Sequence, residues 1–251
     1  SLGDIELENV RYRRIRYSDA SLSTNDDCHY DWDNHGDSGD YHYFRYERIR
    51  WRVLQTTGDQ ALLLADRILD ARPYHTDGSV GATWETSTVR SWLNGYDDSE
   101  NSAGTDYSGN SFMSTAFDAS DQAAIITSTV DNGSTGPYSA TLGGGDTNDK
   151  ILLLSAYDLY GSTAAWYGFC EDAEHNDEAR RCKSTTFARA MGAYADLGEE
   201  ALPGNGFFWL RSPGYNATYA AYVDYNGMVY YYGDQTAQAD YGIRPALILD
   251  L

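Results

Sequence analysis

The chain has 251 residues, 41% of them hydrophobic, so it can bury a substantial core and disorder is not the expected state. It carries 18 Lys and Arg against 38 Asp and Glu, which gives a formal net charge of −20 at pH 7. Nucleic-acid binding depends on clustered Lys and Arg, so no nucleic-acid partner is expected. No apolar run is long enough to span a bilayer, and membrane insertion is not expected either.

The first 44 residues are predicted to form one strand and a long acidic loop. The strand covers residues 5–17, where the basic residues alternate with Tyr and Ile as on an exposed strand face, at Arg11, Arg13, Arg14 and Arg16. The loop covers residues 25–43, which are rich in Asp, Asn, His and Gly.

One part of this loop, residues 31–36, matches the first half of a calcium-binding loop, with oxygen donors at every second residue and Gly36 at the sixth position. The twelfth position is His42, where such loops need a bidentate Glu. A solvated acidic loop is therefore favoured. No cofactor or metal site is expected, and adventitious calcium binding is the alternative left open.

A β-hairpin is predicted over residues 49–64, where apolar residues alternate at period two around a turn at residues 57–59. A helix is predicted over residues 86–94, because Val89, Trp92 and Leu93 have helical spacing and Asn94-Gly95 follows as a stop signal. Similar signals predict further elements: helices over 112–117, 121–126 (capped by Ser120) and 179–192, and a buried strand over 150–155.

The last part of the chain is predicted to form antiparallel strands, over residues 207–211, 220–224, 228–232 and 242–251. The final strand is expected to pair near the N-terminal strand. Arg211 and Arg244 each lie in an apolar frame, and they are expected to tie strands together through carboxylates or backbone carbonyls. The tryptophans expected in the core are Trp84, Trp92, Trp166 and Trp209.

Two of these strands are predicted to form a hairpin across residues 225–227, where Gly227 can take the positive φ of a three-residue turn. In this register Val223 faces Val229 on the buried side, whereas a two-residue Asn-Gly turn would split the two valines between faces. The opposite side then carries outward-facing residues, namely Tyr222, Asp224, Met228, Tyr230 and Tyr232.

Tyrosine is concentrated in this region, since eight of the chain's 22 tyrosines lie within residues 215–241. Tyr offers a large, stiff, amphipathic contact area at little entropic cost, and with Asn, Ser and Gly it dominates evolved binding surfaces. Tyrosines also favour strands for purely structural reasons, but three in a row at 230–232 place rings on both faces. The predicted ligand-binding residues are Tyr215, Asn216, Tyr219, Tyr222, Asp224, Tyr225, Asn226, Tyr230, Tyr232, Asp234, Asp240 and Tyr241.

The three cysteines, Cys28, Cys170 and Cys182, are too few for a disulfide scaffold. Cys170 and Cys182 close a loop if the protein is extracellular, or they are free thiols, and both interpretations stay open. No pattern for a catalytic nucleophile, a phosphate cradle or a set of metal ligands is present. No catalytic residue is predicted, and the chain is not expected to be an enzyme.

Several segments resemble an uncharacterised bacterial family whose members carry such a domain on secreted or surface proteins. The most specific are Trp-Leu-Arg-Ser-Pro-Gly at 209–214 and Gly-Ile-Arg-Pro-Ala-Leu at 242–247. The family is similar to the C-type-lectin fold in its formylglycine-generating-enzyme-like branch. The resemblance implies an α+β fold of antiparallel sheets, few short helices and long loops. It also implies a single domain over 1–251, in which 1–44 precede a family core at 45–251, and an extracellular or cell-surface location.

Some family members look like variable proteins of diversity-generating retroelements, in which adenines of a C-terminal coding repeat are randomised. The resemblance implies a variable region at 209–247 and a diversified surface that binds a protein or other cell-surface ligand. The alternative is a carbohydrate-binding adhesin module of fixed specificity. An oxidase of the formylglycine-generating type is a third interpretation, but that branch uses late cysteines and this chain has none after Cys182.

Overall fold

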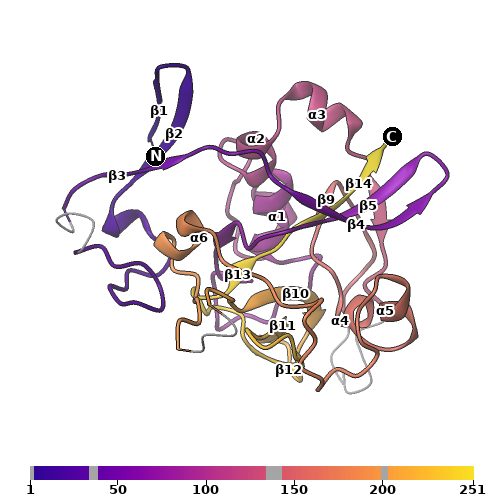
Figure 1. The fold of residues 1–251 in the computed structure, drawn as a ribbon. Helices are drawn as coiled ribbons and strands as arrows, with labels where there is room; N and C mark the ends of the chain where they lie inside the picture. The colour runs from indigo at the N-terminus through magenta and orange to yellow at the C-terminus, as the bar shows by residue number, and fades with distance from the viewer. Residues whose placement is uncertain (1–2, 34–38, 134–142, 199–202) are drawn as a thin grey trace.

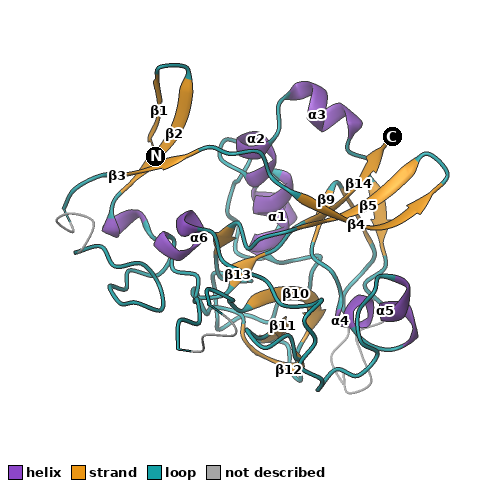
Figure 2. Ribbon diagram, in the orientation of Figure 1, coloured by secondary structure: helices purple, strands orange, loops and turns teal. Residues whose placement is uncertain are grey.

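The computed structural model describes residues 3–33, 39–133, 143–198 and 203–251. Small, mostly antiparallel sheets and short helices are joined by long loops in a mixed α+β arrangement (Figures 1 and 2). The α+β class expected from the sequence is therefore confirmed. Among the described residues, no helix combines the length and the apolar character that a bilayer crossing requires.

The N-terminal sheet has the strand order β1-β2-β3, with β1 at Gly3–Leu7, β2 at Val10–Ile15 and β3 at His42–Arg45. Its first two strands form a hairpin that stands away from the rest of the molecule (Figure 1). The prediction of one strand over 5–17 is wrong because Glu8 and Asn9 both have positive φ, 51° and 62°, and reverse the chain. Two such residues form the tight turn that suits strand twist.

A second sheet has the order β4-β5-β14-β9, with bounds Trp51–Thr57, Gln60–Ala65, Ala246–Asp250 and Ile151–Leu152. The hairpin predicted over 49–64 is confirmed. The last strand does not pair near the N-terminal strand: β14 lies between β5 and β9. Pro245 has no N–H to donate and separates β14 from the short strand before it, so the predicted strand 242–251 is divided.

The C-terminal sheet has the order β12-β11-β10-β13-β6, with bounds Val229–Gln235, Tyr219–Val223, Phe208–Pro213, Gly242–Ile243 and Asp70–Ala71. Only β10 and β13 run parallel among these pairs. The predicted hairpin register is confirmed, because Val223 pairs with Val229 and both side chains are buried. The strand predicted over 207–211 corresponds to β10.

The helix predicted over 86–94 is confirmed as α1, Thr88–Asn94, which Ser87 caps and Gly95 ends at φ 75°. The other helices are α2 at Phe112–Ala116, α3 at Ala119–Ala124, α4 at Ala156–Leu159, α5 at Ser162–Trp166 and α6 at Thr186–Ala190. Single 3-10 turns lie at Tyr17–Asp19 and Asp98–Glu100. A separate pair of strands joins β7, Ser128–Val130, to β8, Thr147–Asp149.

Three element predictions differ from the structure in their extent. Helix α3 begins earlier than predicted because Asp118, not Ser120, accepts from the backbone N–H groups at its start. The strand predicted over 150–155 pairs only at β9, although its residues are buried. The helix predicted over 179–192 reduces to α6. The fully buried Arg180 instead donates to the carbonyl at the end of α4 and to two loop carbonyls, those of Leu159, Asp172 and His175.

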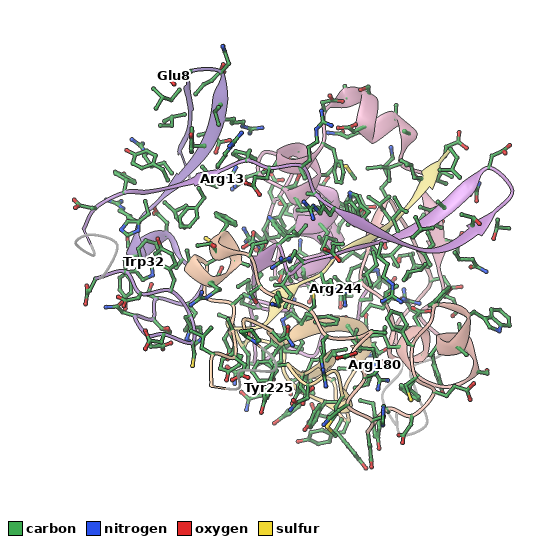
Figure 3. The ribbon with its side chains drawn as sticks, viewed as in Figure 1. Glu8, Arg13, Trp32, Arg180, Tyr225 and Arg244 are labelled. Carbon is green, nitrogen blue, oxygen red and sulfur yellow. The ribbon has the colours of Figure 1, made fainter. Side chains whose placement is uncertain are left out.

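Buried polar groups brace the core (Figure 3). Arg244 donates to the carbonyls of Ala65 and Arg180, and Arg211 donates to Asp158 and to the carbonyl of Leu153, as predicted for both arginines. The tryptophans at 84, 92 and 209 are buried as expected. The prediction for Trp166 is wrong: it lies on the short helix α5 and is 73% exposed.

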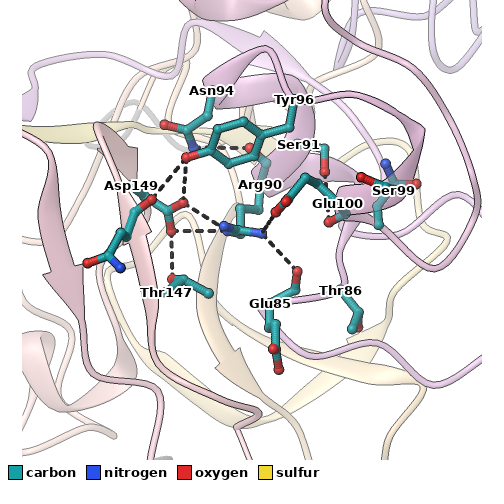
Figure 4. Close-up of polar contacts among 12 residues, drawn as sticks. Glu85, Thr86, Arg90, Ser91, Asn94, Tyr96, Ser99, Glu100, Thr147 and Asp149 are labelled. Atoms are coloured by element: carbon teal, nitrogen blue, oxygen red, sulfur yellow. Dashed lines mark hydrogen bonds and ion pairs between the residues drawn. The ribbon is translucent and has the colours of Figure 1, made fainter.

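The carboxylate of Asp149 is the centre of a buried polar network (Figure 4). It is 0% exposed and accepts from Trp84 Nε1, Arg90 Nε, Tyr96 Oη and Thr147 Oγ1 at 2.7–3.0 Å. Arg90 also donates to the carbonyl oxygen of Glu85 and to Glu100. This network fixes α1 to β8, and a fully hydrogen-bonded buried ion pair becomes costly when one partner is removed.

Candidate functional site

The hairpin of β11 and β12 presents two tyrosines side by side. Tyr222 and Tyr230 are directly paired across the ladder, and their rings stack with centroids 4.9 Å apart and planes 2° apart. The valines of the next pair, Val223 and Val229, are buried on the other side. Tyr230 is 39% exposed and Tyr222 is half-buried. The strand alternation thus places the aromatic pair outward on an apolar base, as the sequence predicts.

Asp224 does not project from this surface, so the prediction of an outward side chain is wrong there. It is 5% exposed, and its Oδ1 accepts from the backbone N–H groups of Asn226 and Met228. A three-residue turn leaves these N–H groups without ladder partners, and the carboxylate supplies an acceptor for them. Asp224 therefore holds the turn, while Gly227 takes the predicted positive φ of 88°.

Tyr241 is also buried, at 5% exposed, although the sequence suggested that it would be displayed. Its ring stacks on Trp209 at 4.1 Å and meets the Tyr222 ring edge-on at 4.9 Å. Its hydroxyl donates to Asp234 Oδ2 at 2.9 Å. Burial raises the pKa of Tyr241. Tyr241 thus forms a second layer of rings beneath Tyr222, because a flat apolar tryptophan surface is available there.

The aromatic surface continues beyond the predicted residues. Phe207 lies 6.0 Å from Tyr222 and 5.7 Å from Tyr225, and Tyr194 lies 4.7 Å from Phe207, measured between ring centroids. The sequence around Tyr194 alternates small and aromatic residues, and this pattern could have predicted that Tyr194 faces outward. In the structure Ala193 and Ala195 are both buried while Tyr194 is not. We name the whole surface the tyrosine face, and its members are Tyr194, Phe207, Tyr222, Tyr225, Tyr230 and Tyr232.

The remaining predicted residues flank this face. Tyr215 and Tyr219 form a second ring pair at 4.6 Å, and Tyr215 is 51% exposed. Within the tyrosine face, Tyr232 is 52% exposed, whereas its half-buried neighbour Tyr231 contacts Tyr160 after α4. The Asn216 side chain serves the backbone, since its Oδ1 accepts from the Thr218 N–H. At Asn226 it is the backbone carbonyl that makes the contact, by accepting from Arg181 Nε.

The tyrosine face is acidic as well as aromatic. Residues 215–241 contain no Lys or Arg, and Asp234 and Asp240 are both half-buried there. Burial raises the pKa of Tyr222 to about 12, so its phenol is a neutral hydrogen-bond donor at physiological pH. Burial also raises the pKa of Asp240. The surface therefore offers ring faces, phenol donors and carboxylate acceptors, which suit non-covalent binding.

The sequence also raised a calcium-like segment and three cysteines as candidates for metal binding or disulfide chemistry. The calcium-like segment 31–36 extends into residues outside the described ranges. Within the described ranges, no group of His, Cys, Asp and Glu has the arrangement of a metal site. The three cysteines are free thiols, and burial raises the pKa of Cys182, which disfavours its thiolate.

The comparisons with known proteins identify a family. Residues 58–251 match the model of a family described as a domain of unknown function (DUF6273), and the chain belongs to that family. No curated protein and no solved structure matches it. The matched segment contains the whole tyrosine face, whereas the N-terminal sheet precedes it.

Proposed function

We propose that this member of the DUF6273 family is a binding protein, which uses the tyrosine face to hold a protein or other cell-surface ligand. The observation that carries the proposal is the Tyr222–Tyr230 pair, stacked in parallel and partly open to solvent on a buried valine base. Rigid aromatic side chains lose little entropy on binding, and a few of them dominate most interfaces.

The arrangement beneath the pair supports the same proposal. Tyr241 and Trp209 brace Tyr222 from below, and Asp224 fixes the turn beside it, so the display does not depend on the outermost rings. A frame that stands without its surface residues tolerates substitution at those residues. We therefore extend the proposal to a C-type-lectin-like scaffold whose region 209–247 is diversified by a retroelement.

Diversification has its own test in the genome. A near-copy of the codons for residues 209–247, which differs only at adenines and lies beside a reverse transcriptase gene, is the expected arrangement. A single invariant coding region in many related strains would instead favour an adhesin of fixed specificity. Either result leaves the binding function of the tyrosine face to be tested separately.

Binding is tested by screening the purified chain against arrays of extracellular proteins and of glycans. Every true ligand of the tyrosine face should be lost in the double variant Tyr230→Ala/Tyr232→Ala, because both rings are exposed. The double variant should lose no more than about 1.5 kcal/mol of unfolding free energy, the usual value of the aromatic stack that Tyr230 makes with Tyr222. Tyr222 is left intact, since it packs on Tyr241 and its removal would disturb the frame.

The matched control is Tyr41→Ala, which removes a 39% exposed tyrosine that directly precedes β3, outside the tyrosine face. It should retain all array signals. Protein hits that depend on Tyr230 and Tyr232 support the proposal, and glycan hits with the same dependence support the carbohydrate-binding alternative. If no hit depends on Tyr230 and Tyr232, or if the dependent hits vanish equally in the control, the tyrosine face is not a binding site.

A further inference from the structure

A cleft of about 1460 Å3 lies between the N-terminal sheet and the helices α1, α2 and α3. One wall is formed by the continuous segment 43–51, which links β3 to β4, and α6 contributes at its other side. This wall precedes residue 58, where the family match begins, so the cleft joins the family domain to a part of the chain outside the match.

The charge of this cleft is opposite to that of the whole chain. Seven of the chain's 18 basic residues line it, but only five of its 38 acidic residues do. The seven are arginines, at positions Arg11, Arg13, Arg45, Arg48, Arg50, Arg67 and Arg72. Arginine presents a planar fork of donors that matches a carboxylate, so its concentration here in an acidic protein indicates an anionic ligand.

Four of these seven arginines are exposed, and their guanidinium groups have no polar partner among the described residues. Arg11 and Arg13 pair with Asp4, and Arg72 lies 3.7 Å from Asp70. The other four form no hydrogen bond or ion pair through their guanidinium groups with any residue that the structure describes; they are Arg45, Arg48, Arg50 and Arg67. These four groups are therefore free to pair with a ligand of negative charge.

The cleft also has an aromatic floor. Trp51 stacks with Phe117 at 6.3 Å, Phe117 meets Phe112 at 5.7 Å, and Phe112 meets Trp92 at 5.8 Å, measured between ring centroids. The Arg72 guanidinium lies 4.1 Å over the Trp92 ring and ends the row. A ligand that fits both features carries apolar side chains toward the floor and acidic groups toward the arginines.

The backbone of the wall points to an extended peptide. Strands β3 and β4 are edge strands of their sheets, and the segment between them belongs to no ladder. Among the described residues, the N–H groups of residues 47–49 donate no hydrogen bond. Free edge groups are the ones that an added peptide strand pairs with, and alternating side chains then face the pocket.

We infer that the cleft binds an acidic peptide segment in extended conformation, with carboxylates on the free arginines and apolar side chains on the aromatic floor. The probe is a fluorescent peptide of alternating Glu and Val, followed by fluorescence anisotropy. The peptide with Gln in place of Glu should bind at least about tenfold more weakly. Adding salt should weaken only the acidic peptide, because charge attraction between exposed groups is screened.

The double variant Arg48→Glu/Arg50→Glu should weaken binding of the acidic peptide by about tenfold or more, since it replaces attraction with repulsion. The matched control is Arg16→Glu, which reverses an exposed charge outside the cleft, next to Tyr41. It should leave the affinity within about twofold. Should the double variant lose its circular dichroism spectrum, the single variants Arg48→Gln and Arg50→Gln replace it.

Two further probes separate this inference from its competitors. N-methylation of alternate residues along one edge of the peptide should abolish binding if it adds as a strand. Equal binding of the Glu and Gln peptides, insensitivity to N-methylation, or an equal loss in Arg16→Glu would overturn the inference. So would tighter binding of a sulfated oligosaccharide than of the peptide, with the same dependence on Arg48 and Arg50.

Discussion

The tyrosine face and the arginine cleft both rest on aromatic rings, yet they carry opposite charges. The first has carboxylates and no basic residue within 215–241, and the second gathers seven arginines. A net charge of −20 therefore agrees with the first surface and not with the second, although it excludes binding modes that require basic charge over the whole molecule. Partners can be predicted from charge only after the charge has been assigned to individual surfaces.

The two surfaces also differ in how their side chains are held. On the tyrosine face, Tyr222 is fixed by the rings of Tyr241 and Tyr230 and by a closed turn. In the cleft, the guanidinium groups of Arg45, Arg48, Arg50 and Arg67, which lie at the end of β3, in the segment that follows it and after β5, make no polar contact with described residues. A preorganised surface loses little entropy on binding, whereas a free arginine must be ordered by its ligand.

The largest effect should come from the frame that both surfaces share. Replacing Asp149 by Ala leaves the Arg90 guanidinium buried without its carboxylate, which should reduce the free energy of unfolding by about 3–5 kcal/mol. Both surfaces should lose their structure in the same transition when urea denaturation is followed by fluorescence. The control Glu100→Gln removes a half-exposed partner of the same arginine and should cost less than about 1 kcal/mol. Equal losses in the two variants would contradict this account.

A second substitution should separate the surfaces. Gly227 has φ 88°, and a Cβ there would fall on the backbone carbonyl of Asp177. Gly227→Ala should therefore cost about 1–3 kcal/mol and weaken binding at the tyrosine face, while the peptide affinity of the cleft stays unchanged. Gly109→Ala is the control, because nothing lies near its added methyl group. Unequal binding by the two variants at the cleft would show that the surfaces are coupled.

The smallest effect concerns pH. Burial raises the pKa of Tyr222 from 10.0 to about 12, so between these values the unfolded chain has lost a proton that the folded chain retains. The free energy of unfolding should then fall as the pH rises through this window. Tyr222→Phe should show a shallower fall, measured by urea denaturation at several pH values. Identical slopes for the two proteins would mean that the phenol of Tyr222 is not buried in solution.

Local patterns predicted much of the C-terminal sheet. Alternation and a single glycine were enough to place Val223 opposite Val229, because strand register follows from turn length. The same alternation failed for Asp224 and Tyr241, which have polar groups but find buried partners in backbone N–H groups and in Asp234. Strand periodicity tells which side a residue takes, and it does not tell what covers that side.

The arginine cleft was beyond prediction for a different reason. Its arginines lie on separate segments, and the sequence indicated only an exposed strand face for Arg11 and Arg13. Bringing these beside Arg67 and Arg72 requires long-range packing between the N-terminal sheet and the rest of the chain. The turn at Glu8 and Asn9 was also missed, since Glu seldom adopts positive φ.

The parallel stacking of Tyr222 and Tyr230 has a spectroscopic consequence. Two identical chromophores held 4.9 Å apart with planes 2° apart couple their transitions, and the folded protein should carry this coupling as a signed band in near-ultraviolet circular dichroism. Anything that inserts between the rings or tilts one of them changes the band directly. The protein therefore contains an optical reporter at the position where a ligand is expected to bind, and this reporter needs no added label.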